Sequence, residues 1–146
     1  MSSLPIAAKK HAARWRNGLD SIAVFDSSAI LAVIFNEPGG ETVIPLLQGA
    51  LLSTVNLAEV HARLLLGGSS SELAWNRLLS MGCEVCFFDD TQARLAAEMI
   101  GQTRPYGLSL GDRACLALAI QHRATVYTTD SAWKNLNLDI EVEVIR

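Results

Sequence analysis

One stretch, residues 22–29 (Ile-Ala-Val-Phe-Asp-Ser-Ser-Ala), constrains the fold of this chain more than any other. Four apolar residues that run into an acid and two hydroxyls predict a buried strand at residues 22–25, ending where a helix begins. In an open α/β sheet, ligands bind beyond the carboxyl ends of the strands. The stretch therefore predicts that Asp26 lies at such an edge, in a position suited to chemistry.

The remaining sequence alternates short apolar segments with segments of helical periodicity. Further strands are predicted at residues 51–55, 84–88, 125–128 and 141–145. Helices are predicted at residues 28–35, 41–48, 57–66, 91–100 and 110–122, with another between the serines at 69–71 and Gly82 and a short one after residue 130. Residues 104–108, which include a proline and a glycine, are predicted to form a loop. This alternation predicts an α/β fold with a central parallel sheet of about five strands, flanked by helices on both faces.

Length and charge divide the chain into one domain and one extension. A chain of 146 residues suits a single domain, which we assign to residues 21–146. That part carries eight Lys or Arg against fourteen Asp or Glu, whereas residues 1–20 form a basic extension with four Lys or Arg against one Asp. An acidic domain argues against indiscriminate binding to nucleic-acid backbones. For the extension, an amphipathic helix or a loosely held segment is favoured over a transit peptide or an RNA tether.

Apolar runs and cysteines bear on the cellular location. No apolar run reaches the ~18 residues that a membrane-spanning helix needs, so we expect a soluble protein without a membrane partner. The three cysteines, Cys83, Cys86 and Cys115, form an odd set without the spacing of a disulfide framework. This usage indicates a reducing compartment and predicts a cytoplasmic protein. The Cys83-x-x-Cys86 pair is interpreted as packing and not as a zinc or redox site, because no second pair accompanies it.

Four acidic residues occur where helices are predicted to begin. Asp26, Glu59 and Asp130 lie at or just beyond the ends of predicted strands, and Asp112 follows the predicted loop. Because the carboxyl ends of parallel strands meet at one edge of a sheet, the first three are expected to converge, and Asp112 joins them only if the fold brings it there. Each acid alone also fits a helix cap, and the two capping boxes would be Asn56-x-x-Glu59 and Ser109-x-x-Asp112. The combination of all four favours a shared site.

A cluster of carboxylates favours a hard divalent cation. Like charges held close together raise one another's pKa values unless a cation compensates them. Mg²⁺ is usually bound by a few carboxylates together with water or phosphate, and Mn²⁺ suits the same oxygen ligands. No His ligand accompanies the four acids, which argues against zinc. The sequence therefore predicts Mg²⁺ (or Mn²⁺) as the cofactor.

Four segments resemble the acidic motifs of PIN-domain nucleases, particularly the VapC-type toxins of bacterial toxin–antitoxin pairs. These segments are Asp26-Ser27-Ser28-Ala29, Asn56-Leu57-Ala58-Glu59, Ser109-Leu110-Gly111-Asp112 and Thr129-Asp130 with Trp133. The similarity in order and spacing covers about residues 22–146. The basic extension is a departure, and Gly111 stands where the family often has Ala, a small-for-small change that we expect to matter little.

The resemblance implies an Mg-dependent endoribonuclease that acts as the toxin of a toxin–antitoxin system. It would cleave RNA phosphodiester bonds with a metal-activated water. The catalytic residues and metal ligands would be Asp26, Glu59, Asp112 and Asp130. Besides the RNA substrate, the family implies a cognate antitoxin protein and a homodimer. Apolar residues on the predicted helices around 60–66 and 73–79 are expected to leave a surface for such a partner.

Residues beside the four acids are weaker candidates. Ser28 and Thr129 could hydrogen-bond ligands or phosphate in support of the acids, although helix capping is the more frequent role of each. Arg113, Trp133 and Lys134 are candidate substrate contacts to phosphate and base. For these three, solvated charges and a core aromatic are the competing interpretations.

Two other classes of protein share part of this pattern. An Mg-binding α/β signalling or phosphotransfer domain also needs a Lys at a later strand end, and no Lys follows residues 125–128 until Lys134. A non-catalytic RNA- or protein-binding module would use the four acids only as caps. Metal titration separates that module from a nuclease, because caps alone should not bind Mn²⁺ tightly.

Overall fold

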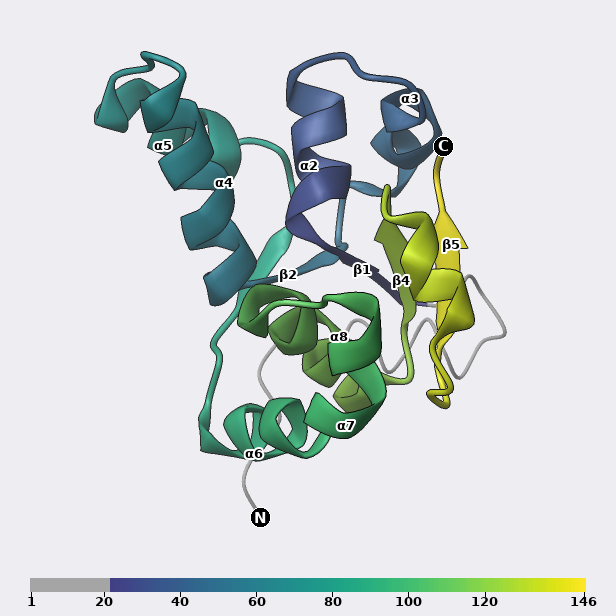
Figure 1. The fold of residues 1–146 in the computed structure, drawn as a ribbon. Coiled ribbons are helices and arrows are strands. Elements are labelled where there is room, and N and C mark those ends of the chain that lie inside the picture. Colours follow the sequence, from purple (N-terminus) through teal and green to yellow (C-terminus); the bar gives the residue numbers. More distant parts are fainter. Residues whose placement is uncertain (1–21) are drawn as a thin grey trace.

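The computed structural model describes residues 22–146, and its centre is a five-stranded sheet (Figure 1). The strands lie in the order β3-β2-β1-β4-β5 and every neighbouring pair is parallel. Their bounds are β1 Ala23–Phe25, β2 Leu51–Ser53, β3 Glu84–Cys86, β4 Thr125–Thr128 and β5 Glu141–Val144. The predicted parallel sheet of about five strands is therefore confirmed.

Helices cover both faces of this sheet (Figure 1). In chain order they are α2 Ser27–Ile34, α3 Gly40–Val43, α4 Thr54–Leu66, α5 Ser71–Leu79, α6 Asp90–Glu98, α7 Ile100–Thr103 and α8 Leu110–His122, with 3-10 turns η1 Ile44–Leu46, η2 Arg104–Tyr106 and η3 Ser131–Asn135. In Figure 1, α2 and α3 lie above the sheet, α6, α7 and α8 lie below it, and the α4–α5 pair projects to one side.

Alternation along the strands gives each face its own hydrophobic cluster. On β1, Val24 belongs to the cluster that includes α8, whereas Ala23 and Phe25 belong to the cluster that includes α2 and α4. Helix α8 is buried from Ala114 to Ala119, as its Ala- and Leu-rich sequence predicts. Residues 22–146 thus carry an apolar layer on each side of the sheet.

The end of β2 differs from the prediction. The predicted strand at residues 51–55 ends at Ser53, because the Ser53 hydroxyl accepts a hydrogen bond from the Val55 amide at 3.2 Å and caps α4. Thr54 and Val55 therefore belong to the helix. Asn56 lies inside α4, so the predicted Asn56-x-x-Glu59 capping box is wrong.

Other boundaries move for similar local reasons. The predicted helix at residues 41–48 is split into α3 and the 3-10 turn η1, which has Pro45 in its first turn. The predicted loop at residues 104–108 contains the 3-10 turn η2. The helical periodicity of residues 57–66 predicts Val60, Leu64 and Leu65 on one apolar face; Val60 and Leu64 are buried, but Leu65 is exposed.

Two predictions concern the periphery of the chain. The basic extension predicted at residues 1–20 lies outside the described residues. Within residues 22–146, no helix is both long and apolar enough to cross a membrane.

Candidate active site at the carboxyl edge of the sheet

Asp26 follows β1 directly and is almost fully buried, with 4% of its surface exposed. Its Oδ1 accepts hydrogen bonds from the Ser28 hydroxyl at 2.6 Å and from the Ala29 amide at 3.0 Å, which caps α2. Its Oδ2 accepts one from the Thr128 hydroxyl at 2.7 Å. Burial raises the pKa of Asp26 to about 6; these hydrogen bonds oppose the rise and the charge of Asp112 adds to it.

Asp112 lies in the first turn of α8 and completes a capping box with Ser109. Its Oδ2 accepts the Ser109 amide at 2.8 Å, and its own amide donates to the Ser109 hydroxyl at 3.2 Å. Burial raises the pKa of Asp112, and the negative charges of Glu59 and Asp130 raise it further. Because Asp112 also acts on Asp26, its carboxylate interacts with all three of the other acids.

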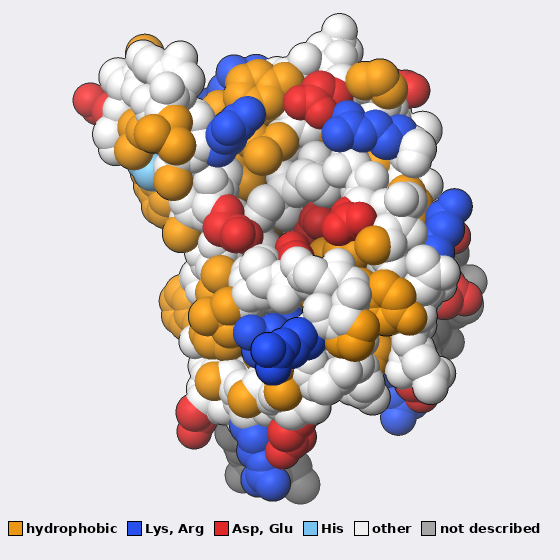
Figure 2. All heavy atoms as spheres, viewed as in Figure 1, with side chains coloured by type: hydrophobic (Ala, Val, Ile, Leu, Met, Phe, Trp, Pro, Cys, Tyr) orange, Lys and Arg blue, Asp and Glu red, His pale blue; other side chains and the backbone are white. Residues whose placement is uncertain are grey.

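Glu59 and Asp130 are exposed at the same edge. Glu59 Oε1 accepts hydrogen bonds from the Ser27 hydroxyl at 2.7 Å and from Asn56 Nδ2 at 2.9 Å. Asp130 follows β4 and caps η3, since its Oδ1 accepts the Ala132 amide at 3.0 Å. Figure 2 shows acidic side chains gathered around a hollow at the centre of this face, between α2 above and α8 below.

The acids at this edge therefore both cap helices and interact with one another. Asp26, Asp112 and Asp130 all cap helical segments, as the local interpretation requires. The same three residues, with Glu59, also bring their charges to one edge of the sheet. A cap needs only one acid near one helix end, so capping does not explain why four acids from different segments interact.

Hydroxyl groups support the acids at this edge. Ser28 donates to Asp26 and accepts from the Thr129 amide at 2.9 Å. Thr129 thus contributes its backbone and not its side chain, while the neighbouring Thr128 binds Asp26 and accepts from the Asp130 amide at 3.1 Å. Thr128 is not among the predicted site residues, although its place at the end of an apolar strand beside Thr129 and Asp130 is a signal visible in the sequence.

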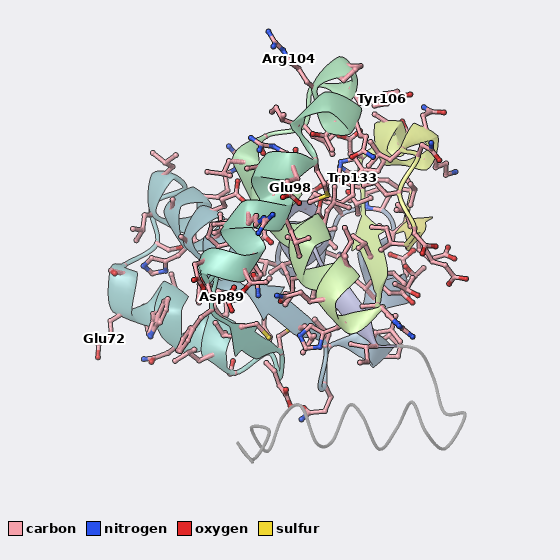
Figure 3. The ribbon with its side chains drawn as sticks, turned by 90° about the horizontal axis from the view of Figure 1, so that it is seen from below. Glu72, Asp89, Glu98, Arg104, Tyr106 and Trp133 are labelled. Carbon is pink, nitrogen blue, oxygen red and sulfur yellow. The ribbon has the colours of Figure 1, made fainter. Side chains whose placement is uncertain are left out.

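The three candidate substrate contacts, Arg113, Trp133 and Lys134, differ in their burial and contacts. Trp133, a residue of η3, is 1% exposed and packs in the core (Figure 3), which matches the core-aromatic alternative and leaves no free ring face for a base. Arg113 is half-buried and donates from Nη1 to the Ala96 carbonyl at 2.9 Å, so it joins α8 to α6. Lys134 is exposed. Arg104, which sequence analysis did not consider, points outward from η2 (Figure 3).

The donor set suits a hard cation in its chemistry. All four acids offer oxygen, Asp26 and Asp112 have raised pKa values, and a nearby cation would favour their charged forms. With the side chains as they lie in residues 22–146, no group of three or more His, Cys, Asp or Glu is placed to hold a metal ion. Hydrogen bonds hold Glu59 on Ser27 and Asn56, and hold Asp112 on Ser109.

A parallel sheet with this acidic edge defines an α/β domain of the PIN class. The sequence pattern of the PIN domain matches residues 23–137, and the chain belongs to the PIN domain family. Among curated proteins, none matches the sequence.

Solved structures share the fold. The chain is similar to one in VapBC2 from Rickettsia felis bound to a DNA fragment from their promoter, with a TM-score of 0.64, 17% identity and coverage of 84% of this chain and 97% of that chain. It is also similar to one in FitAcB from Neisseria gonorrhoeae, with a TM-score of 0.64, 22% identity and coverage of 83% and 96%. A toxin-antitoxin complex from Klebsiella pneumoniae gives a TM-score of 0.63, 17% identity and coverage of 83% and 99%. At such low identities the likeness concerns the fold alone.

Proposed function

We propose that this PIN domain is an Mg²⁺- or Mn²⁺-dependent endoribonuclease and the toxin of a toxin–antitoxin pair. The observation that carries the proposal is the interaction of Asp112 with three other acids, Asp26, Glu59 and Asp130, from different segments of the chain in a member of the PIN family. Buried or mutually repelling carboxylates cost stability, and such groups are concentrated at sites that bind cations or do chemistry.

The four acids would hold the cation. Asp26 is the best ordered of them, because three donors fix both of its oxygens. Asp112 is held by Ser109 at the start of its own helix, Glu59 accepts from Ser27 of α2, and Asp130 lies on the exposed side. A bound Mg²⁺ or Mn²⁺ would supply a water of lowered pKa and stabilise developing charge on phosphate oxygens. Ser28 and Thr128 orient Asp26 and disfavour its rotation away from the site.

RNA is the proposed substrate, held close to the site. The domain is acidic, so a long electrostatic contact along a nucleic-acid backbone is disfavoured. Lys134 is exposed within η3, the short helical turn that Asp130 caps, and is the proposed contact to phosphate. Arg113 is assigned to packing because its guanidinium binds the Ala96 carbonyl.

An antitoxin protein is the proposed partner. The α4–α5 pair exposes several large apolar side chains, and Figure 2 shows hydrophobic atoms on this projecting part. The exposed residues are Leu65, Leu66, Leu73, Trp75 and Leu79. Contiguous exposed apolar side chains are characteristic of interaction surfaces. The similar solved structures include a toxin-antitoxin complex, which agrees with this proposal. The homodimer implied by the family is proposed as well.

An RNA-cleavage assay tests the activity. Purified protein should cleave RNA with Mg²⁺ or Mn²⁺ and lose cleavage in EDTA. Asp26→Asn and Asp112→Asn should each reduce cleavage by at least about 100-fold, because each removes one negative ligand. Both variants should stay folded, since an amide oxygen can still accept the capping hydrogen bonds. Cleavage at the wild-type rate in either variant would refute the site assignment.

A non-catalytic binding module is the second candidate, and the observed caps favour it. In that case the acids serve only their helices, and no divalent cation should bind tightly. Calorimetric titration with Mn²⁺ separates the two candidates. Saturable binding that Asp112→Asn weakens supports the nuclease, whereas no binding supports the module.

A further inference from the structure

Three residues hold the carboxylate of Glu59, and we call them the Glu59 contact group: Ser27, Asn56 and Gly111. The Ser27 hydroxyl and Asn56 Nδ2 both donate to Glu59 Oε1, at 2.7 and 2.9 Å. Gly111 provides the space, because a Cβ atom at this position would lie 2.5 Å from both carboxylate oxygens. An exposed glutamate is thus held by hydrogen bonds from α2 and α4 and lies close against Gly111 of α8.

Asn56 is the centre of this group and is 1% exposed. Its Nδ2 also donates to the Gly111 carbonyl at 3.1 Å and lies 3.2 Å from Ser27 Oγ. A carboxylate and a carbonyl oxygen can only accept, so the amide must point its nitrogen toward them. Its Oδ1 is buried and has no hydrogen-bond partner among the described residues. An unpaired buried oxygen costs stability, so the side chain of Asn56 is oriented by the hydrogen bonds that its Nδ2 group donates.

The contact group joins the three segments that carry three of the acids. Ser27 follows Asp26 at the start of α2, Asn56 shares α4 with Glu59, and Gly111 precedes Asp112 on α8. The charge of Glu59 acts on Asp112, so the two carboxylates repel each other when no cation is present. Without the contact group, an exposed glutamate would turn toward solvent and away from Asp112.

We propose that Asn56 and Gly111 are positioning residues, which fix the Glu59 carboxylate at the edge of the sheet that carries Asp112 before a divalent cation binds. This inference rests on the proposed metal-dependent function. Asn56 acts by donating to Glu59, and Gly111 acts by leaving room for the carboxylate. If the Asn56 donors or the space at Gly111 are lost, the Glu59 carboxylate can move away. Cation binding must then order this carboxylate again. Removal of groups that orient metal ligands typically weakens metal binding by about 10- to 100-fold.

The lack of a side chain at Gly111 therefore matters for the position of Glu59. An alanine at this position would displace Glu59, contrary to the expectation that the change matters little. The carboxylate is the far end of a flexible, exposed side chain, so it can move at little cost in stability. Gly111→Ala thus separates the placement of Glu59 from the stability of the fold.

The test measures the Mn²⁺ dissociation constant of the full chain by calorimetry, with the melting temperature as a check on folding. Asn56→Leu keeps the side-chain size and removes the donors, and Mn²⁺ should bind at least about tenfold more weakly. Gly111→Ala should weaken binding similarly with an almost unchanged melting temperature. Gln92→Leu is the matched control, because Gln92 is a buried amide on α6 that bonds Gln121 at 2.9 Å and also has an unpaired oxygen. It should leave Mn²⁺ affinity unchanged.

A double-mutant cycle identifies the residue through which Asn56 acts. In a Glu59→Ala background, Asn56→Leu should cause no further loss of Mn²⁺ affinity. An equal loss in both backgrounds, or wild-type affinity in Gly111→Ala, would overturn the inference. If Asn56→Leu does not fold, the Gly111→Ala result decides alone. A wild-type protein that binds no Mn²⁺ overturns the proposed function together with this inference, whereas normal binding by wild type and both variants overturns only the inference.

Discussion

The side chain of Asp26 caps a helix and is also almost fully buried. Its Oδ1 must cap α2, and its whole carboxyl group must be buried between β1 and β4. Three hydrogen bonds stabilise the charged form, yet burial outweighs them and the pKa is raised. The native protein therefore binds a proton at Asp26 more tightly than the unfolded chain does, which makes stability depend on pH in a predictable direction.

The pH dependence of stability tests the burial of Asp26. Protonation of Asp26 contributes stability fully below its usual pKa of 3.8, and this contribution is lost as the pH rises through about 6. The rise in the Asp26 pKa from 3.8 to about 6 corresponds to about 3 kcal/mol of unfolding free energy. Asp26→Asn should flatten the curve of unfolding free energy against pH in that range. Urea unfolding in EDTA at several pH values measures the unfolding free energy of wild type and of Asp26→Asn. Equal slopes against pH for these two proteins would contradict the raised pKa of Asp26.

Repulsion at Asp112 makes a second prediction for a single residue. In EDTA, Asp112→Asn should raise the melting temperature, because it removes repulsion from Glu59 and Asp130 while the amide oxygen still accepts from Ser109. A gain of 1 kcal/mol corresponds to about 2–4 °C. Mg²⁺ or Mn²⁺ should then stabilise wild type more than the variant. A variant that melts lower in EDTA, with a wild type indifferent to metal, would refute the shared carboxylate site.

At the level of elements, the α4–α5 pair has two different faces. Val60 and Leu64 on α4 pack with Ala74 and Leu78 on α5 in one hydrophobic cluster. The other face exposes apolar side chains, including Leu66 at 84% exposure. Burial on one face explains the fold of the pair, but it does not explain the apolar residues on the other, which fits their proposed role in partner binding.

Two leucines on α5 test this division. Leu78 is 5% exposed, so Leu78→Ala should cost about 2–5 kcal/mol of unfolding free energy. Leu73 is 72% exposed, so Leu73→Ala should change it by less than about 0.5 kcal/mol. Chemical denaturation of the isolated chain gives both values. A large cost at Leu73 would show that this face is already covered in the protein alone.

For the whole molecule, the strand order creates the site. β1 lies at the centre with β2 and β4 on either side, so the segments after these three strands are neighbours at one edge. Asp26 directly follows β1, Asp130 comes two residues after the end of β4, and Glu59 lies on the helix that begins after β2. Helix α8 packs against the sheet from below and adds Asp112.

The same architecture predicts that the basic extension is dispensable for folding. Deletion of residues 1–17 should leave a folded domain, because the described sheet begins at Ala23 and both described clusters lie within residues 22–146. Circular dichroism melting of the truncated and full chains measures this, and the two melting temperatures should agree within a few degrees. An insoluble or unfolded truncation would show that the extension packs into the core.

Local sequence determined the kinds of element and most of their ends. Apolar runs and helical periodicity depend on neighbouring residues, so they predicted the strands, their parallel arrangement and the buried helix at residues 110–122. Caps at Asp26 and Asp112 are contacts over three residues, which makes them visible in the sequence. The ordered acidic motifs also pointed to the family that the match to residues 23–137 confirms.

Tertiary structure decided what those residues touch. Thr128 binds Asp26 across 102 positions, Asn56 binds Gly111 across 55, and Arg113 is occupied by Ala96 across 17. The burial of Trp133 depends on elements that are remote in the chain. Periodicity records which side of an element is apolar but not which neighbour covers it. The local sequence could therefore propose the four acids, and only packing could set the burial of Asp26 and the place of Glu59.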